Sequence, residues 1–227
     1  PTKKYPVFMN LYGGPGSQQV LDKWSSGDRY WYQMMADKGY IIACVDNRGT
    51  GGRGEDFKKC TYLELGKLET ADQIEAAKYL GTLNYVDKSR IGFQGWSYGG
   101  FMACNLITKG ADYFKATIAV APVTNWKYYD NIYTERFMRK PKDNNSGYED
   151  NSPTSHVKKI KGKFLLIHGS SDDNVHIQNS MELVAAMVKY NIPFEYMVYP
   201  NKNHGISGGM TRMHIYGKMF KFVKENL

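Results

Sequence analysis

The most informative motif in the sequence is Gly95-Trp96-Ser97-Tyr98-Gly99. An apolar run over residues 90–94 precedes it and predicts a strand, and residues 101–108 after it predict a helix. Gly-x-Ser-x-Gly between a strand and a helix is typical of a strained turn that exposes the serine hydroxyl, because glycine lets the two elements approach closely. We therefore expect Ser97 to be a nucleophile rather than part of a purely structural turn.

Strands and helices alternate along the rest of the chain. Short apolar runs predict strands over residues 5–12, 40–45, 116–121, 163–168 and 194–199. Apolar residues at helical spacing predict helices over 29–37, 69–83, 177–190 and 209–226. Residues 47–54 are expected to form an irregular loop, and residues 139–155 a surface loop. This alternation implies a mostly parallel sheet with helices on both faces. Together with the Ser97 turn it predicts an α/β-hydrolase fold over residues 1–227.

Composition excludes several other classes of protein. Of the 227 residues, 42% are hydrophobic and 14% aromatic, which is enough to build a sizeable core. The net charge is +8, but the lysines are scattered and form no basic stripe, so we expect a solvated surface and no nucleic-acid partner.

Cys44 and Cys104 lie in apolar runs and are expected to be buried thiols. The chain opens with Pro1 shortly before a predicted strand, so we expect a fragment of a longer protein.

A serine hydroxyl becomes a good nucleophile when a histidine accepts its proton and a carboxylate orients that histidine. In this fold the acid and the histidine follow the serine in chain order, each on a loop after a later strand. Asp172 and His204 occupy such positions and should lie at the same sheet edge as Ser97. Asp173 fits as well as Asp172 by spacing alone.

The remaining histidines fit the catalytic position less well. His168 ends a predicted strand and is expected to be packed in the interior. The other three do not follow a strand and are expected on the surface or on helices: His156, His176 and His214. No group of His, Cys and Asp has metal-ligand spacing, so we expect neither a metal nor a cofactor.

With these positions in place, longer segments of the chain resemble the dipeptidyl peptidase IV branch of the prolyl oligopeptidase family. The segments that carry the resemblance are GWSYGG at 95–100, HG-x-x-DDNVH at 168–176, NHGI at 203–206, APVTNWKYYDNIYTERF at 121–137 and KYPVFMNLYGGPGSQ at 4–18. They occur in the family's order over nearly the whole chain. The resemblance favours Asp172 over Asp173 as the acid.

The resemblance also implies roles for other residues. Tyr12 would donate its hydroxyl to the oxyanion, and the backbone N–H of Tyr98 would be the second donor. The family's proline pocket corresponds to Tyr98, Val123, Trp126, Tyr129, Tyr133 and Val175. By spacing alone, the aromatic residues in this set favour a core stripe on one helical face, and the resemblance reverses this preference. Asn174 matches a residue that contacts a substrate carbonyl, and Arg136 matches a basic residue beside the pocket.

The function implied by the resemblance is release of N-terminal Xaa-Pro dipeptides through an acyl-enzyme on Ser97. Its substrates would be peptides with proline or alanine at the second position. The alternatives are a prolyl tripeptidyl or acylaminoacyl peptidase, a broad esterase, and a non-catalytic binding protein. Members of this branch also carry an N-terminal β-propeller with a glutamate pair that binds the substrate amine, and no Glu-Glu pair occurs in this chain. They carry further sheet strands before the segment that begins at Pro1, so the resemblance implies that the sheet of this chain lacks its first strands. A homodimer and a periplasmic or cell-surface location are implied by resemblance only.

Overall fold

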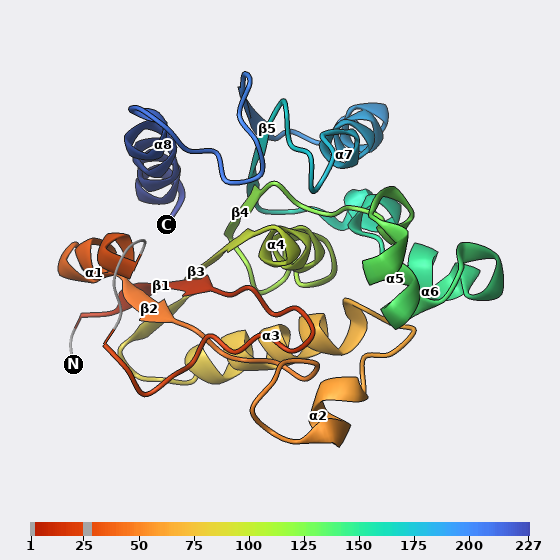
Figure 1. Ribbon diagram of the computed structural model, residues 1–227. Coiled ribbons are helices and arrows are strands. Elements are labelled where there is room, and N and C mark those ends of the chain that lie inside the picture. Colours follow the sequence, from red (N-terminus) through yellow and green to blue (C-terminus); the bar gives the residue numbers. More distant parts are fainter. Residues whose placement is uncertain (1–2, 25–28) are drawn as a thin grey trace.

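A computed structural model describes residues 3–24 and 29–227 and contains a six-stranded sheet (Figure 1). Every neighbouring pair of strands is parallel, in the order β2-β1-β3-β4-β5-β6. The strands are β1 (Tyr5–Asn10), β2 (Ile41–Ala43), β3 (Val86–Trp96), β4 (Ala116–Val120), β5 (Lys163–Gly169) and β6 (Glu195–Tyr199). Because the strands run the same way, the loops that follow them meet at one edge of the sheet.

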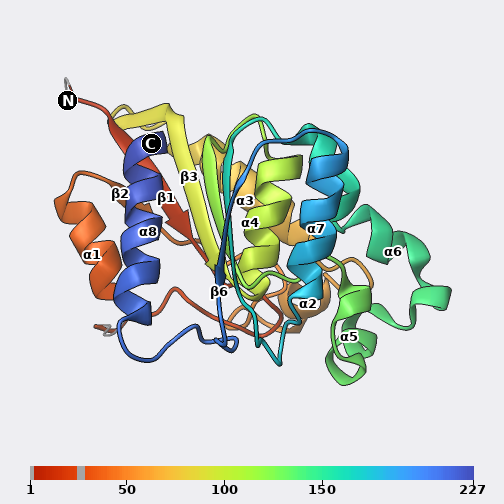
Figure 2. The same cartoon turned by 90° about the horizontal axis from the view of Figure 1, so that it is seen from above.

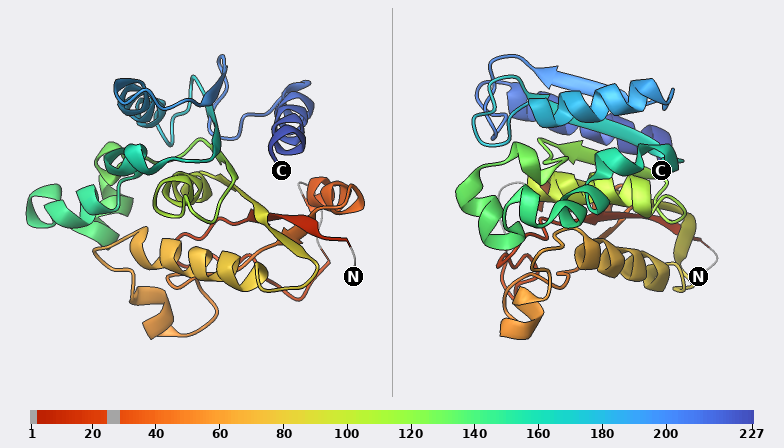
Figure 3. Two further views of the ribbon diagram at one scale, coloured as in Figure 1. Left: turned by 180° about the vertical axis from the view of Figure 1, so that it is seen from behind. Right: turned by 90° about the vertical axis from the view of Figure 1, so that its right-hand side faces the viewer.

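Helices cover both faces of this sheet (Figure 2). On one face lie α1 (Arg29–Asp37) and α8 (Thr211–Asn226); on the other lie α3 (Lys67–Leu80), α4 (Tyr98–Lys109) and α7 (Gln178–Lys189). The shorter helices α2 (Glu55–Lys59), α5 (Asn131–Met138) and α6 (Asn145–Asp150) lie farther from the sheet (Figure 3). The chain therefore has the predicted α/β-hydrolase fold.

The core has one apolar cluster on each face of the sheet. Phe8 and Leu165 pack with Met35 of α1 and Ile215 of α8. The larger cluster joins the opposite side chains of the sheet to α3, α4 and α7. Helix α4, which follows Ser97, is buried along almost its whole length. The nucleophile turn is thus held between a central strand and a central helix.

The structure corrects some expectations of local structure. Residues 139–155, predicted as a surface loop, contain α6 and two 3₁₀ helices, Pro141–Asp143 and Pro153–Lys159. The prediction was wrong because the segment is polar in composition, yet Tyr148 is 1% exposed and its hydroxyl donates to the carbonyl of Arg139. Helix α2 lies between the predicted elements and was not anticipated.

The three cysteines are all free thiols. Cys104 is buried on α4, as predicted, and burial raises its pKa. Cys44 is only half-buried, because β2 ends at Ala43 and lies at the edge of the sheet. Within the part of the chain that the structure describes, no helix is both long and apolar enough to span a membrane.

Candidate active site

Ser97 lies on a strained turn between β3 and α4. Its backbone has φ 62° and ψ −117°, which is unusual for a residue with a side chain. A Cβ at Gly95 would lie 2.0 Å from the carbonyl oxygen of Gly99, and a Cβ at Gly99 would lie 2.2 Å from that of Leu11. Both positions therefore require glycine, because the backbone of another segment comes too close to leave room for a side chain. The motif predicted the glycines for this reason.

Asp172 and His204 form a hydrogen-bonded pair at the same edge of the sheet. The loop after β5 carries Asp172, and the loop after β6 carries His204. His204 Nδ1 lies 2.8 Å from Asp172 Oδ2, and the Asp172 side chain is fully buried. Asp173 is exposed, so the structure separates the two neighbouring carboxylates that spacing alone left open.

The Asp172 carboxylate accepts hydrogen bonds on both of its oxygens. Oδ1 accepts from the backbone N–H groups of Asn174 and Val175, at 3.0 and 2.9 Å. Oδ2 lies 3.2 Å from Nε2 of the buried His168 in addition to His204. Burial alone would raise the pKa of Asp172, but the hydrogen bonds from the two histidines outweigh it and hold the pKa well below its usual range. The carboxylate is consequently ionised at neutral pH.

His168 is packed in the interior, as predicted, and its contacts with Asp172 were not anticipated. It is 0% exposed, and its Nε2 lies 2.8 Å from the carbonyl oxygen of Val175. A carbonyl only accepts hydrogen bonds, so Nε2 carries the proton and Nδ1 accepts from the hydroxyl of Ser180 at 2.7 Å. His168 therefore presents an N–H to Asp172 and helps to orient the carboxylate.

Trp96 links the His204 loop to the serine turn. The indole N–H of Trp96 donates to the backbone carbonyl of His204 at 3.0 Å, so His204 lies beside the neighbour of Ser97. No hydrogen bond joins the Ser97 hydroxyl to a described residue. Such a contact is often long in a site without substrate and shortens in the complex.

Two donors flank the serine turn. Tyr12 follows β1, and burial raises the pKa of its phenol, so the hydroxyl stays protonated and able to donate. Tyr98 is the first residue of α4, and the first N–H groups of a helix have no partner within it. The rings of these tyrosines are 5.9 Å apart.

The turn that follows Tyr12 is fixed by buried polar contacts that sequence reasoning missed. Asn47, 1% exposed, donates from Nδ2 to the carbonyl of Gly13 at 3.1 Å and accepts from Gln73 on Oδ1 at 3.3 Å. The segment 47–54 was predicted only as a loop. Its Asn-Arg-Gly start gave a turn signal but no indication of what the amide would contact.

The aromatic residues of the predicted pocket come together in space. Trp126 lies 5.4 Å from Tyr98, 5.7 Å from Tyr129 and 5.7 Å from Tyr133, measured between ring centroids. The helical spacing inferred for them was wrong: Trp126 is in a 3₁₀ helix (Trp126–Tyr128), Tyr129 is extended, and Tyr133 is in α5. Val123 and Val175 are buried in the same apolar cluster.

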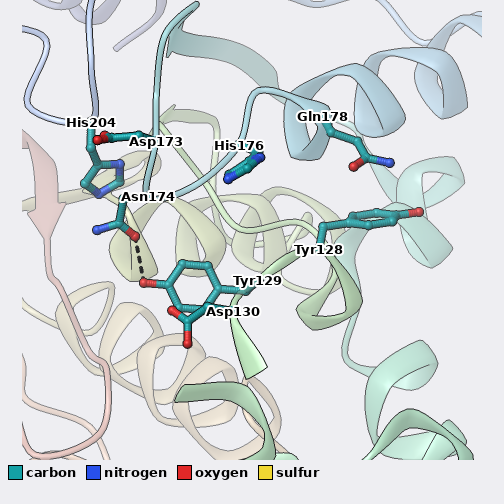
Figure 4. Close-up of a pocket in the computed structure, with 8 residues that line it drawn as sticks. All are labelled: Tyr128, Tyr129, Asp130, Asp173, Asn174, His176, Gln178 and His204. Atoms are coloured by element: carbon teal, nitrogen blue, oxygen red, sulfur yellow. Dashed lines mark hydrogen bonds between the residues drawn. The ribbon is translucent and has the colours of Figure 1, made fainter. Parts of the chain in front are cut away.

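A cavity of about 670 Å³ opens between His204 and Tyr129 (Figure 4). Tyr98 and Trp126 do not line it, because both are buried beneath this surface. Within it the Tyr129 hydroxyl donates to Asn174 Oδ1 at 2.7 Å. Sequence reasoning had not placed four of the lining residues in a site: Tyr128, Asp130, His176 and Gln178.

Arg136 does not line this cavity. It lies exposed on α5 and borders a separate apolar cavity of about 460 Å³ with Pro15 and Phe137. Among residues 3–24 and 29–227, no group of three or more His, Cys, Asp or Glu side chains is placed to hold a metal ion.

The strained serine turn, the buried acid–histidine pair and the parallel sheet define an α/β-hydrolase. Comparison with known families then matches residues 27–227 to the prolyl oligopeptidase family of serine peptidases. The chain belongs to this family.

Relatives and solved structures agree with this assignment. The chain is 40% identical to prolyl endopeptidase FAP of Mus musculus over 99% of its own length, and 45% identical to a probable dipeptidyl-aminopeptidase B of Trichophyton verrucosum over 90%. The crystal structure of dipeptidyl peptidase 4 from Porphyromonas gingivalis matches with a TM-score of 0.96 and 52% identity over 99% of the chain. The chain spans 30%, 23% and 32% of these three proteins, respectively.

Proposed function

We propose that this chain is the catalytic part of a serine exopeptidase that releases Xaa-Pro dipeptides from the N-termini of peptides. The observation that carries the proposal is the Asp172–His204 hydrogen bond, formed at the sheet edge where the half-buried Ser97 lies on its strained turn. The family supports peptidase chemistry, and two of the three similar proteins are named for dipeptide release. Neither a metal nor a cofactor has a role in the proposal.

In the proposed reaction Ser97 Oγ attacks the carbonyl carbon of the scissile bond while His204 Nε2 takes its proton. The Nδ1–H of His204 donates to Asp172, which leaves the Nε2 lone pair free to act as the base. His204 then gives the proton to the leaving amine as the C–N bond breaks. A water molecule then attacks the Ser97 ester while His204 takes its proton. His204 returns this proton to Ser97 Oγ as the dipeptide is released.

The negative charge on the carbonyl oxygen needs donors that are already in place. Tyr12 Oη and the N–H of Tyr98 are the proposed pair, one from each side of the serine turn. A single donor of this type contributes about 3–4 kcal/mol to the stability of the transition state.

The aromatic cluster supplies the proposed proline pocket. A pyrrolidine ring is compact and apolar, and its nitrogen has no hydrogen in the peptide. The rings of Tyr129 and Tyr133, with Trp126 packed against both, can therefore surround it without leaving a donor unpaired. Asn174 accepts from Tyr129 on Oδ1, so its amide N–H groups remain available for a carbonyl of the substrate.

The proposal also covers the part of the natural protein outside this chain, its assembly and its location. The similar proteins are more than three times as long as this chain, and we infer that the natural protein carries an N-terminal β-propeller that binds the substrate amine. We also infer a homodimer and a periplasmic or cell-surface location, on family resemblance. Light scattering and fractionation of the natural protein test these two inferences.

The direct test is hydrolysis of a Gly-Pro chromogenic substrate by the natural full-length protein. We expect turnover by the wild type and loss of at least a thousandfold with Ser97→Ala. Absence of turnover by a folded wild type, or equal turnover by the Ser97→Ala variant, would contradict the proposal.

A second function has a specific observation in its favour, because one similar protein is named an endopeptidase. A matched set of substrates separates the alternatives: free Gly-Pro, N-blocked Gly-Pro, an Ala-Ala-Pro tripeptide, and a simple ester. Preference for the free dipeptide supports the proposal. Preference for another substrate of the set identifies an endopeptidase or acylaminoacyl peptidase, a tripeptidyl peptidase, or an esterase.

A further inference from the structure

A buried carboxyl group lies directly behind the proposed pocket. Glu69 is on α3 and is 0% exposed. Its Oε1 accepts from the Tyr98 hydroxyl at 2.7 Å, and its Oε2 accepts from the backbone N–H of Gly66 at 2.9 Å. An ionised carboxyl in the core is rare unless donors satisfy it, so its presence here requires an explanation.

Tyr98 connects this carboxyl to the reacting centre. It follows Ser97 in sequence, and its backbone N–H is one of the two proposed oxyanion donors. Its ring is 2% exposed and contacts Tyr12, the other proposed donor, and Trp126 in the pocket. The orientation of a single phenol therefore affects the wall of the pocket and both donors.

Little else holds the far end of the Tyr98 side chain. Within the described residues, the hydroxyl of Tyr98 hydrogen-bonds to Glu69 alone. The ring is confined by Phe101 and Trp126, and Gly14 is so close that a Cβ there would lie 3.0 Å from it. These apolar contacts limit where the ring can lie, whereas the carboxyl sets the direction of its hydroxyl.

We propose that Glu69 is a positioning residue for catalysis: its carboxyl anchors the Tyr98 phenol, and this anchor fixes the pocket wall and the adjacent oxyanion donor. The proposal rests on the proposed function, in that Tyr98 is taken to contribute to oxyanion and proline binding. Glu69 contacts no substrate in this account and acts through Tyr98.

The charge of Glu69 gives the anchor a pH dependence. Burial raises its pKa to about 7, against the hydrogen bonds from its own backbone, Tyr98 and Gly66, which lower it. Asp72, on the same helix, also raises it. The cations that act on this site from other segments are Arg48, on the loop after β2, and Lys109, at the end of α4. The ionised carboxyl accepts from both donors, so the anchor is strongest above pH 7.

A purely structural role makes a different prediction. The bond from the backbone N–H of Gly66 to Oε2 caps α3, and a helix cap stabilises the folded protein. If Glu69 only capped the helix, its variants would unfold at lower temperature and would react at the wild-type rate while folded.

The test compares Glu69→Gln with the wild type in the natural full-length protein. Two rates are measured from pH 5.5 to 8.5: turnover of the Gly-Pro substrate and the labelling of Ser97 by a fluorophosphonate. Every group other than Glu69 is common to the two proteins, so its contribution cancels in the ratio of the wild-type rate to the variant rate. We expect this ratio to rise about tenfold through pH 7, mainly in kcat. A ratio that is constant with pH would overturn the proposal.

Two further variants keep the result interpretable. Glu75→Gln removes an exposed carboxylate from the same helix, paired with Lys78, and should react like the wild type. In a Tyr98→Phe background, Glu69→Gln should cause no further loss of rate, because the hydroxyl through which Glu69 acts is absent. A full additional loss in that background would show that Glu69 does not act through Tyr98 and would overturn the proposal.

The two rates also separate this proposal from the proposed function. If the wild type is labelled at Ser97 but does not cleave Gly-Pro substrates, the dipeptidase assignment fails and the labelling ratio still tests Glu69. If Gly-Pro cleavage is normal and the ratio stays flat in both assays, the role of Glu69 fails and the dipeptidase assignment stands.

Discussion

Replacing Asp172 with asparagine exchanges one carboxylate oxygen for an NH₂ group at the centre of the site. In the wild type Oδ1 accepts from two backbone N–H groups, and Oδ2 accepts from His204 and His168. The asparagine oxygen must stay at the Oδ1 position, because an NH₂ group there would face two donors. The NH₂ group therefore takes the Oδ2 position and points at His204.

The size of the effect follows from this geometry. An NH₂ group only donates, so His204 must present the lone pair of Nδ1 to it and carry its proton on Nε2. A protonated Nε2 cannot accept the proton of Ser97. A change of this kind in a serine–histidine–aspartate site lowers kcat about 10⁴-fold, which corresponds to roughly 5 kcal/mol in the activation free energy.

The assay is steady-state hydrolysis of a Gly-Pro substrate by the natural full-length protein, with thermal melting to verify folding. Asp173→Asn is the matched control: it makes the same chemical change on the adjacent, exposed carboxylate and should keep kcat within about threefold of the wild type. The reasoning is refuted if a folded Asp172→Asn variant retains more than a tenth of wild-type kcat, or if Asp173→Asn loses as much.

Three further predictions address the oxyanion donors, the serine turn and the pH dependence of folding. Tyr12→Phe should lower kcat by about 10²–10³ with little change in melting temperature; a loss below tenfold would contradict its role as a donor. Gly99→Ala should lower the free energy of unfolding, measured in urea, by about 3 kcal/mol or more, because its Cβ would lie 2.2 Å from the Leu11 carbonyl oxygen. Gly217→Ala on α8, where the added Cβ would meet open space, should raise the free energy of unfolding by about 0.5–1 kcal/mol. The pKa of Asp172 is lowered by folding, so its carboxylate stabilises the folded protein above the unfolded pKa of 3.8, and this contribution is lost as the pH falls further; acid titration of melting temperature should show a steeper loss for the wild type than for Asp172→Asn.

The sequence predicted the elements whose signal is local. Apolar runs bounded by turns located the six strands, and the Ser97 motif located the helix after it, because burial on both faces of a parallel sheet leaves little choice of residue type. The strand ends also predicted that Asp172 and His204 would meet. Spacing did not distinguish Asp172 from Asp173, because burial decides between them and depends on how the loop turns.

The features that were missed depend on long-range contacts. Tyr148 is buried although its neighbours in sequence are polar, so segment 139–155 resembled a surface loop. The aromatic pocket is assembled from a 3₁₀ helix, an extended residue and a separate helix, which no single periodicity describes. Glu69 has the sequence context of an ordinary helical glutamate. Only the packing of α3 against α4 places its carboxyl behind Tyr98.

Ser97 can be tested as the nucleophile by identifying the residue that a fluorophosphonate labels in the natural full-length protein. Mass spectrometry of the digested adduct should place one phosphonyl group on Ser97, and unfolding the protein or replacing His204 with alanine should abolish the reaction. Labelling at another residue, or no labelling of a folded protein that retains Asp172 and His204, would contradict the assignment of Ser97 as the nucleophile.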